Sequence, residues 1–470
     1  MPDTSAEHVA VVLAPGIFAS HLVDPGGGMA WPINRSLQMI RHLVASPSAQ
    51  RAAFHEDKAV RFLAQGPTGA VSAAQASAGF QNIFLESYRP FLEACAGAGP
   101  SGSRNLPFEP HPFALGYNFT RSNAITAWRT IVPETLRILE ALRKRLGIPA
   151  QPRFIFVTHS MGALAVRYAL LKNPALQKRC ICVIHVAAPN AGAPETLLRF
   201  IRGSKDKPPV STIFGDEGWK CLTSASTIGA GLELLPYGMW RDRRQIQAFA
   251  KVLVNTTTPL PDGADPFPDV MASIIETQLG AGSATRKLLV TGGTGGEQTL
   301  EIPDSGAHRI AQSQKAEIAA DIQKHLTRAA EFHEQLRDWV FERTGFVALG
   351  GVATVQGIEV ETVNGLLVSA RERVSNDGDG TVPLSSQLYP KPRAHVTASG
   401  LHFVAKTPDM TGVEHVQALG DRASAHFPSI FELMSKLYQC APRGGVEAPV
   451  RPSPVGASTT LLAALRGAQV

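Results

Sequence analysis

The 470-residue sequence lacks the motifs on which metal- and nucleotide-dependent enzymes rely. Its five cysteines are an odd number, and no two are spaced as C-x-x-C, so neither a disulfide framework nor a cysteine zinc site is predicted. An H-E-x-x-H zinc motif and a G-x-x-x-x-G-K phosphate loop are also missing. The glycine run Gly292–Gly296 has no such lysine, and we interpret it as a plain loop. The sequence therefore predicts no metal ion and no cofactor.

Long apolar runs and blocks of like charge are missing as well. Lysine and arginine total 45 against 39 aspartates and glutamates, a net charge of +6 that is scattered along the chain. This disfavours nucleic acid as a partner and leaves peripheral contact with anionic membrane lipid open. No window is apolar over the roughly 20 residues that a transmembrane helix needs. Residues 1–16 lack the basic start and apolar core of a signal peptide. A cytoplasmic location is the default expectation, with signal-less export left open.

What the chain does contain is an alternation of buried strands and helices. His8–Ala14, Phe154–Thr158 and Cys180–Ala188 are short, almost continuously apolar runs, typical of strands covered on both faces. Ser122–Leu146 and Gly162–Asn173 carry apolar residues at helical spacing. Strands and helices joined by short links predict an α/β fold with a mostly parallel central sheet flanked by helices.

The pattern changes after residue 194. Residues 195–345 show helical segments and loops, with Lys287–Val290 as the one short strand signal. We therefore predict a catalytic core formed by residues 1–194 and 346–440 and interrupted by a large, mainly helical cap or lid at 195–345. Residues 441–470, rich in proline, glycine and alanine, are predicted to be a flexible tail.

Phe156–Gly162 (FVTHSMG) places a serine between a buried strand and a helix. This is the setting of a nucleophile elbow, a strained turn that must be flanked by small residues. Gly162 meets that need two residues after Ser160, while Thr158 stands where glycine is common on the other side. A chance T-H-S-M-G in a loop would lack the strand–turn–helix context. Ser160 is therefore the predicted nucleophile.

A serine hydrolase also needs hydrogen-bond donors for the oxyanion of its tetrahedral intermediate. In this fold one donor is the backbone N–H of the residue after the nucleophile, here Met161. The other comes from the loop after an early strand, and Gly16 directly follows the first apolar run. We predict the N–H of Ile17 as this second donor, with that of Phe18 as the alternative.

The acid is expected between the nucleophile and the base, because this fold orders its triad as serine, acid, histidine. The segment 376–383 (NDGDGTVP) holds two acids among glycines. We favour Asp379 over Asp377, because it stands three residues before Val382, where the chain should return to the core. The segment lacks the further spaced acids and terminal glutamate of a calcium loop.

Four histidines follow the acid. His415, in a loop before the last predicted helix, is favoured as the base, and His402, which follows a strand pattern, is the competitor. His395 lies inside a strand-like run and is interpreted as structural, while His426 lies at the start of the last helix. The base would take the proton of Ser160 and later protonate the leaving alcohol.

Four segments together resemble the lecithin–cholesterol acyltransferase-like lipases and esterases of the α/β-hydrolase superfamily. They are Val12–Ser20 (VLAPGIFAS), Val157–Tyr168 (VTHSMGALAVRY), Val186–Pro194 (VAAPNAGAP) and Asp377–Pro383 (DGDGTVP). The resemblance implies Ser160 as nucleophile, Asp379 as acid and a late histidine, best matched by His415. It also implies an oxyanion loop at Gly16–Ile17.

The sequence departs from the family pattern in two places. Ala19 stands where the family often has the second glycine of P-G-I-x-G-S, and Tyr117–Arg121 (YNFTR) only partly matches the family's Y-D-W-R element. The resemblance therefore supports acyl-ester chemistry without selecting one substrate.

We predict a serine hydrolase that cleaves carboxylic esters of lipids through an acyl-enzyme. An O-acyltransferase that passes the acyl group to an alcohol and a lipid-degrading toxin are the alternatives, and a non-enzymatic scaffold is the least favoured. Leu232–Tyr237 (LELLPY), Met239 and Trp240 form an apolar segment. It is expected to line an acyl-chain tunnel or touch lipid, or else to pack the cap on the core.

Overall fold

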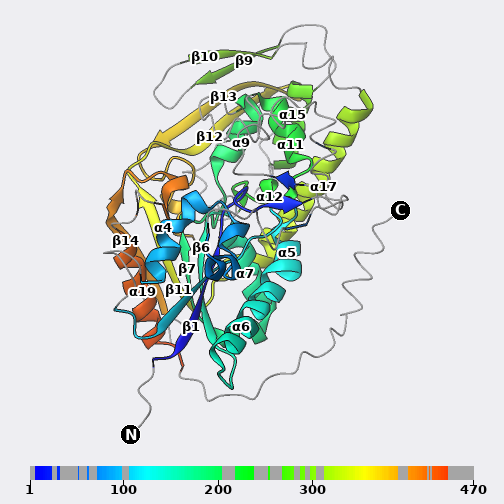
Figure 1. Ribbon diagram of the computed structural model, residues 1–470. Coiled ribbons are helices and arrows are strands. Elements are labelled where there is room, and N and C mark those ends of the chain that lie inside the picture. Colours follow the sequence, from blue (N-terminus) through cyan, green and yellow to red (C-terminus); the bar gives the residue numbers. More distant parts are fainter. Residues whose placement is uncertain are drawn as a thin grey trace.

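The computed structural model describes most of the chain (Figure 1). The described residues are 6–23, 29–31, 51, 61–62, 71–97, 105–203, 217–237, 252–254, 267–279, 286–291, 297–302, 312–389, 401–420, 423 and 426–442. Several sequence predictions lie outside these residues: the tail beyond residue 442, the loop at Gly292–Gly296, Met239, Trp240 and His395.

A central sheet of six strands has the order β14-β11-β7-β6-β1-β5, and every neighbouring pair is parallel. Its strands are β1 (His8–Ala14), β5 (Glu109–Ala114), β6 (Arg153–His159), β7 (Cys180–Val186), β11 (Arg343–Gly350) and β14 (Leu401–Thr411). The middle strands β1, β6 and β7 are buried almost throughout, as their apolar runs predicted. The expected parallel sheet is confirmed.

Strand β5 carries no sequence signal of the kind that predicted its neighbours. Its sequence, EPHPFA, contains two prolines, which pair in register with Val9 and Val11 of β1. Proline cannot donate to a sheet ladder, so it is tolerated on an edge strand. β5 lies at the edge of the central sheet, which explains why prolines are accepted there.

Helices cover both sides of this sheet (Figure 1). One side carries a continuous helical segment that begins after the predicted cap Ser122 and consists of α5 (Asn123–Thr126), a π-helical turn (Ala127–Ile131) and α6 (Val132–Leu146). Helix α7 (Gly162–Lys172) lies near this segment. On the other side α4 (Leu85–Cys95) meets α19 (Phe427–Gln439). Phe91 of α4 stacks on Phe431 of α19, with ring centroids 6.0 Å apart.

A second sheet of five strands has the order β10-β9-β13-β12-β8. Its strands are β8 (Val252–Val254), β9 (Arg286–Thr291), β10 (Glu297–Ile302), β12 (Thr354–Val363) and β13 (Leu366–Ser375). Strands β9, β12 and β13 share a separate apolar cluster with α9 (Pro194–Arg202), α11 (Gly218–Ala225), α15 (Phe267–Leu279) and α17 (Gln312–Leu336). Figure 1 shows this second unit above the central sheet.

The second sheet combines strands from both sides of residue 345. The described part of 195–342 is mainly helical, as expected. However, β12 and β13, which lie in the range expected for the core, pair with β8 and β9 of the insertion range. A half-buried strand reveals its period in the sequence but not its partner, because its pattern is the same in any sheet.

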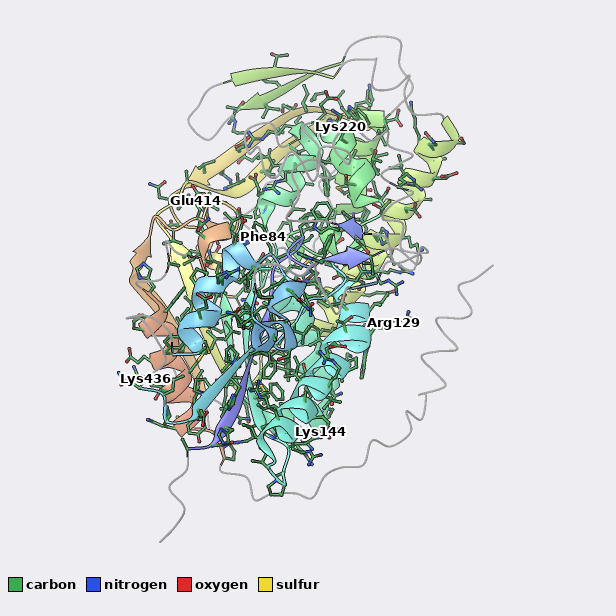
Figure 2. All side chains as sticks on the ribbon, in the orientation of Figure 1. Phe84, Arg129, Lys144, Lys220, Glu414 and Lys436 are labelled. Atoms are coloured by element: carbon green, nitrogen blue, oxygen red, sulfur yellow. The ribbon has the colours of Figure 1, made fainter. Side chains whose placement is uncertain are left out.

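Two surface features bear on partners. Among the described residues, no helix is both long enough and apolar enough to cross a bilayer. Figure 2 labels the exposed basic side chains Arg129, Lys144 and Lys436, which lie on the π-helical turn, α6 and α19. Their distribution matches the scattered charge seen in the sequence.

Candidate active site

Ser160 lies on a sharp turn between β6 and α7. Its φ angle is +52°, a left-handed conformation that costs energy for any residue with a Cβ atom. A Cβ at Gly162 would stand 2.5 Å from the carbonyl oxygen of Pro15, so only glycine permits this approach of helix and loop. The turn has the strain and the small flanking residue that the motif predicted.

His415 and Asp379 extend from Ser160 as one hydrogen-bonded chain. His415 Nε2 lies 2.8 Å from Ser160 Oγ, and His415 Nδ1 lies 2.7 Å from Asp379 Oδ2. Ser160, His415 and Asp379 are 6%, 8% and 1% exposed. Because a carboxylate only accepts, Nδ1 carries the proton and Nε2 is free to accept from the serine hydroxyl.

The Asp379 side chain is held at both oxygens. Oδ1 accepts hydrogen bonds from the backbone N–H groups of Thr381 (3.0 Å) and Val382 (2.7 Å), and Oδ2 accepts from Gln387 Nε2 (3.3 Å). The Asp379 carbonyl also accepts from the backbone N–H of His415 at 2.9 Å. The acid is therefore bound to the loop of its histidine by both backbone and side chain.

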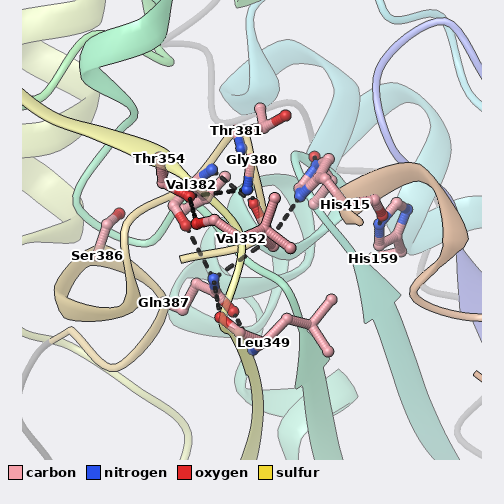
Figure 3. A network of polar contacts seen from close by, with 12 residues as sticks. His159, Leu349, Val352, Thr354, Gly380, Thr381, Val382, Ser386, Gln387 and His415 are labelled. Carbon is pink, nitrogen blue, oxygen red and sulfur yellow. Dashed lines mark hydrogen bonds and ion pairs between the residues drawn. The ribbon is translucent and has the colours of Figure 1, made fainter. Parts of the chain in front are cut away.

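Two further side chains fix the acid loop (Figure 3). Gln387, at the end of α18 (Leu384–Gln387), exchanges hydrogen bonds with the backbone of Leu349 at 2.8 and 3.1 Å. Thr354 Oγ1 accepts from the N–H of Gly380 at 2.8 Å and donates to the carbonyl of Val352 at 2.8 Å. Sequence reasoning missed both, because an isolated glutamine or threonine carries no pattern.

The competing candidates lie elsewhere. Asp377 is exposed, and its carboxylate is within 3.4 Å of Ser375 Oγ. His402 lies within β14, opposite Thr344 of β11. His426 is the residue before α19. Of the predicted acids and bases whose side chains the structure describes, His415 contacts Ser160 and Asp379 contacts His415.

The two predicted oxyanion donors flank the serine. Met161 follows Ser160 directly, and a Cβ on Gly16 would come within 3.1 Å of Ser160 Cβ, so the Gly16–Phe18 loop lies against the nucleophile. Phe18 adopts a φ of +63°, and its carbonyl accepts from Trp31 Nε1 at 3.0 Å. Among the described residues, no acceptor is found for the backbone N–H of Ile17 or of Met161.

His159 and Tyr88 connect the loops around Ser160, and neither was singled out from the sequence. His159 Nε2 lies 2.9 Å from the His415 carbonyl oxygen, and His159 Nδ1 lies 2.8 Å from the Tyr88 hydroxyl. Burial, with a smaller contribution from His415, lowers the pKa of His159 to about 3. His159 is therefore neutral at physiological pH. Its place directly before the serine is the one signal that could have marked it.

Among the residues that the structure describes, one group of side chains converges closely enough to hold a metal ion. It comprises His8, Glu109 and His111. These residues stand at the beginning of β1 and β5, whereas Ser160 follows the end of β6. Arg145 donates to His111 Nδ1 at 3.1 Å, and its positive charge opposes a bound cation. We assign this group no part in the site.

Comparison with known proteins agrees with this architecture. Residues 138–258, which include Ser160, match the family model described as lecithin:cholesterol acyltransferase. A chain of the Tle4-Tli4 complex has a similar structure, with a TM-score of 0.65 and 16% identity, covering 93% of this chain and 100% of that one.

Phospholipase PlaB from Legionella pneumophila aligns with a TM-score of only 0.23 and 11% identity, covering 70% of this chain and 64% of that one. No curated protein sequence matches the chain significantly. The six-stranded parallel sheet and the similar structure identify an α/β-hydrolase fold. The lecithin:cholesterol acyltransferase match over residues 138–258 confirms the resemblance seen in the sequence.

Proposed function

We propose that this protein is a serine hydrolase that cleaves carboxylic esters of lipids, with Ser160 as nucleophile, His415 as base and Asp379 as acid. The observation that carries the proposal is the unbroken hydrogen-bond chain from Ser160 Oγ through His415 to Asp379, at 2.8 and 2.7 Å. Such a chain on a strained strand-to-helix turn is the arrangement that activates a serine for acyl transfer.

The reaction would proceed in two halves. Ser160 Oγ attacks the ester carbonyl while its proton moves to His415 Nε2, and the tetrahedral intermediate collapses when that proton passes to the leaving alcohol. Water then attacks the acyl-enzyme by the same route, returning the serine and releasing the acid. Asp379 stabilises the imidazolium that forms in each half.

The backbone N–H groups of Ile17 and Met161 would hold the negative oxygen of each tetrahedral intermediate. Their positions beside Ser160 and the lack of acceptors for them among the described residues support this role. Donors that are already in place need no reorganisation during the reaction, so each contributes strongly to the rate.

The lipid nature of the substrate is inferred from the family match at residues 138–258. That family is described as an acyltransferase, so the acceptor that attacks the acyl-enzyme is either water or another alcohol. Both reactions use the same acyl-enzyme. Adding a long-chain alcohol during turnover and measuring the ratio of free acid to new ester would separate them.

The first test is the initial rate on p-nitrophenyl esters from acetate to palmitate, for wild type and Ser160→Ala. Loss of the nucleophile should reduce turnover by about four to six orders of magnitude. An optimum at long chains would support a lipid substrate. Wild type that is folded yet inert on every ester would overturn the hydrolase proposal.

A further inference from the structure

The buried contacts of Tyr88 and His159 form a single polar chain around Ser160. The backbone N–H of Gly16 donates to the Tyr88 hydroxyl oxygen at 3.0 Å, and the hydroxyl lies 2.8 Å from His159 Nδ1. His159 Nε2 lies 2.9 Å from the carbonyl oxygen of His415. Tyr88 and His159 are 3% and 5% exposed, so water does not compete for these bonds.

The direction of each hydrogen bond in this chain is determined. A carbonyl oxygen only accepts, so Nε2 of His159 must carry the ring proton. The neutral ring then has a bare Nδ1, which accepts the hydroxyl proton of Tyr88. The Tyr88 hydroxyl oxygen then accepts the hydrogen bond that the backbone N–H of Gly16 donates. Every donor in the chain therefore meets an acceptor, which makes the arrangement unique.

The chain connects the three segments whose relative positions matter for the reaction: the oxyanion loop, the serine turn and the loop of the base. Gly16 belongs to the loop that presents the Ile17 N–H, His159 is covalently attached to Ser160, and the His415 carbonyl belongs to the base. A second tyrosine, Tyr117, donates to the carbonyl of Pro15 at 2.9 Å and holds the other side of the same loop. The Gly16 N–H is engaged by Tyr88, so the next donor along the loop is the Ile17 N–H, for which no acceptor is found among the described residues.

We propose that Tyr88 and His159 are positioning residues that hold the oxyanion loop and the base loop at fixed places relative to Ser160. This inference rests on the proposed acyl-transfer function. Neither side chain touches the reacting atoms; each acts by placing the Ile17 N–H and His415. Their loss should weaken binding of the tetrahedral, negatively charged state more than binding of the neutral ester.

The test compares Tyr88→Phe and His159→Ala with wild type. Removing one oxyanion donor costs about 10²–10³ in kcat, and a displaced donor loses part of that, so kcat should fall on the order of 10- to 100-fold at nearly constant KM. The Kd of butylboronic acid, which forms a tetrahedral anion on an active serine, should rise in step with the loss of kcat. Calorimetry measures this Kd without turnover.

Three controls separate positioning from simple loss of structure. Tyr168→Phe removes the hydroxyl of another buried tyrosine, which donates to Gln335 Oε1 at 2.9 Å outside the chain, and should leave kcat and the boronate Kd unchanged. His159→Gln keeps an N–H donor and should fall between His159→Ala and wild type. The double variant Tyr88→Phe/His159→Ala should lose no more activity than the more impaired of the two single variants, because both substitutions break the same chain.

The outcomes are distinct. If Tyr88→Phe and His159→Ala only lower the fraction of folded protein, the boronate Kd and the kcat per folded molecule stay at wild-type values and the positioning role is wrong. If wild type binds boronate but turns over no ester, the hydrolase proposal fails, while the Kd series still decides the role of the chain. If wild type does neither, both proposals are overturned.

Discussion

The two sheets of this protein are both covered by helices, yet they differ in how they handle polar groups. In the central sheet the middle strands are buried along almost their whole length, and the buried chain from Asp379 to Gly16 lies beyond their carboxyl ends. In the second sheet, β12 and β13 mix buried residues with partly exposed ones, so one face is covered more completely than the other.

This contrast indicates that the two units are stabilised mainly by different interactions. The second unit is held mainly by an apolar cluster, which tolerates volume-conserving change. The loops of the central sheet depend on buried hydrogen bonds, each of which leaves an unsatisfied group when one partner is removed. The units meet at the acid loop, because the β12–β13 hairpin stands in the chain between β11 and Asp379.

The largest effect is expected at the acid. Asp379→Asn should reduce kcat by about 10⁴, because the amide leaves His415 in the wrong tautomer. Asp377→Asn is the matched control, since Asp377 lies two residues away and is exposed; its kcat should stay within about twofold of wild type. Ester hydrolysis at saturating substrate measures both, and an equal loss in the two variants would contradict the assignment of Asp379.

The next effect concerns Arg167, which is 1% exposed on α7. Its guanidinium donates to the carbonyl of Trp339 at 2.7 Å and to Asn190 Oδ1 at 3.3 Å, joining the helix after Ser160 to the segment that leads into β11. Arg167→Met should lower the free energy of unfolding by about 3 kcal/mol, because it leaves buried carbonyls without donors. Urea unfolding measures this loss, and a change below about 1 kcal/mol would show that the contacts contribute little.

Glu233 predicts a pH dependence at the junction of the two units. Its Oε2 accepts from the backbone and the side chain of Asn123 at 2.8 and 2.7 Å, while burial raises its pKa to about 7. A raised pKa means that the folded state holds the proton more tightly than the unfolded state, in which the pKa of this carboxyl group is 4.5. The free energy of unfolding should therefore fall as pH rises from about 4.5 to about 7, by on the order of 3 kcal/mol.

Glu233→Gln is the control for this dependence, because it keeps an acceptor and removes the titration. As pH rises through this range, the unfolding free energy of wild type should fall relative to that of Glu233→Gln. Buried histidines with lowered pKa values titrate in both proteins and cancel in the difference. A difference that is constant with pH would show that Glu233 does not ionise on unfolding as predicted.

The smallest effect is expected inside the second unit. Ile358 of β12 is 1% exposed within the apolar cluster, so Ile358→Val should lower the unfolding free energy by about 0.5–1.5 kcal/mol. The kcat of folded enzyme should not change. A fall in kcat without a fall in stability would mean that this unit takes part in the reaction and would erase the contrast drawn above.

The sequence predicted the parts of the fold that are periodic or fully apolar. The helix from Ser122 to Leu146, the strands β1, β6 and β7, and the strand–turn–helix around Ser160 follow from local patterns, because a buried strand or an amphipathic helix must show its period. The acid and the base were selected by chain order and local composition. The structure brings those two residues to Ser160, while their catalytic roles stay predictions until the variants are measured.

Other features could not be read from the chain. The proline-containing β5 depends on being an edge strand, and the pairing of β12 and β13 with β8 and β9 depends on contacts across long separations. Tyr88 lies 71 residues from His159, and Gln387 lies eight residues beyond Asp379. Neither has a local signature, because a single polar side chain takes its meaning from the buried partner that it meets.

The sequence by itself determined an α/β core with a serine turn between a strand and a helix, because strand burial and helix period are local requirements, whereas the close approach of Pro15 that requires glycine at residue 162 is a tertiary contact. Only the tertiary structure decided which sheet each half-buried strand joins and which polar side chains surround Ser160. The physical reason is that a buried hydrogen bond is strong only when both partners are present and water is excluded, and burial is a property of the whole fold.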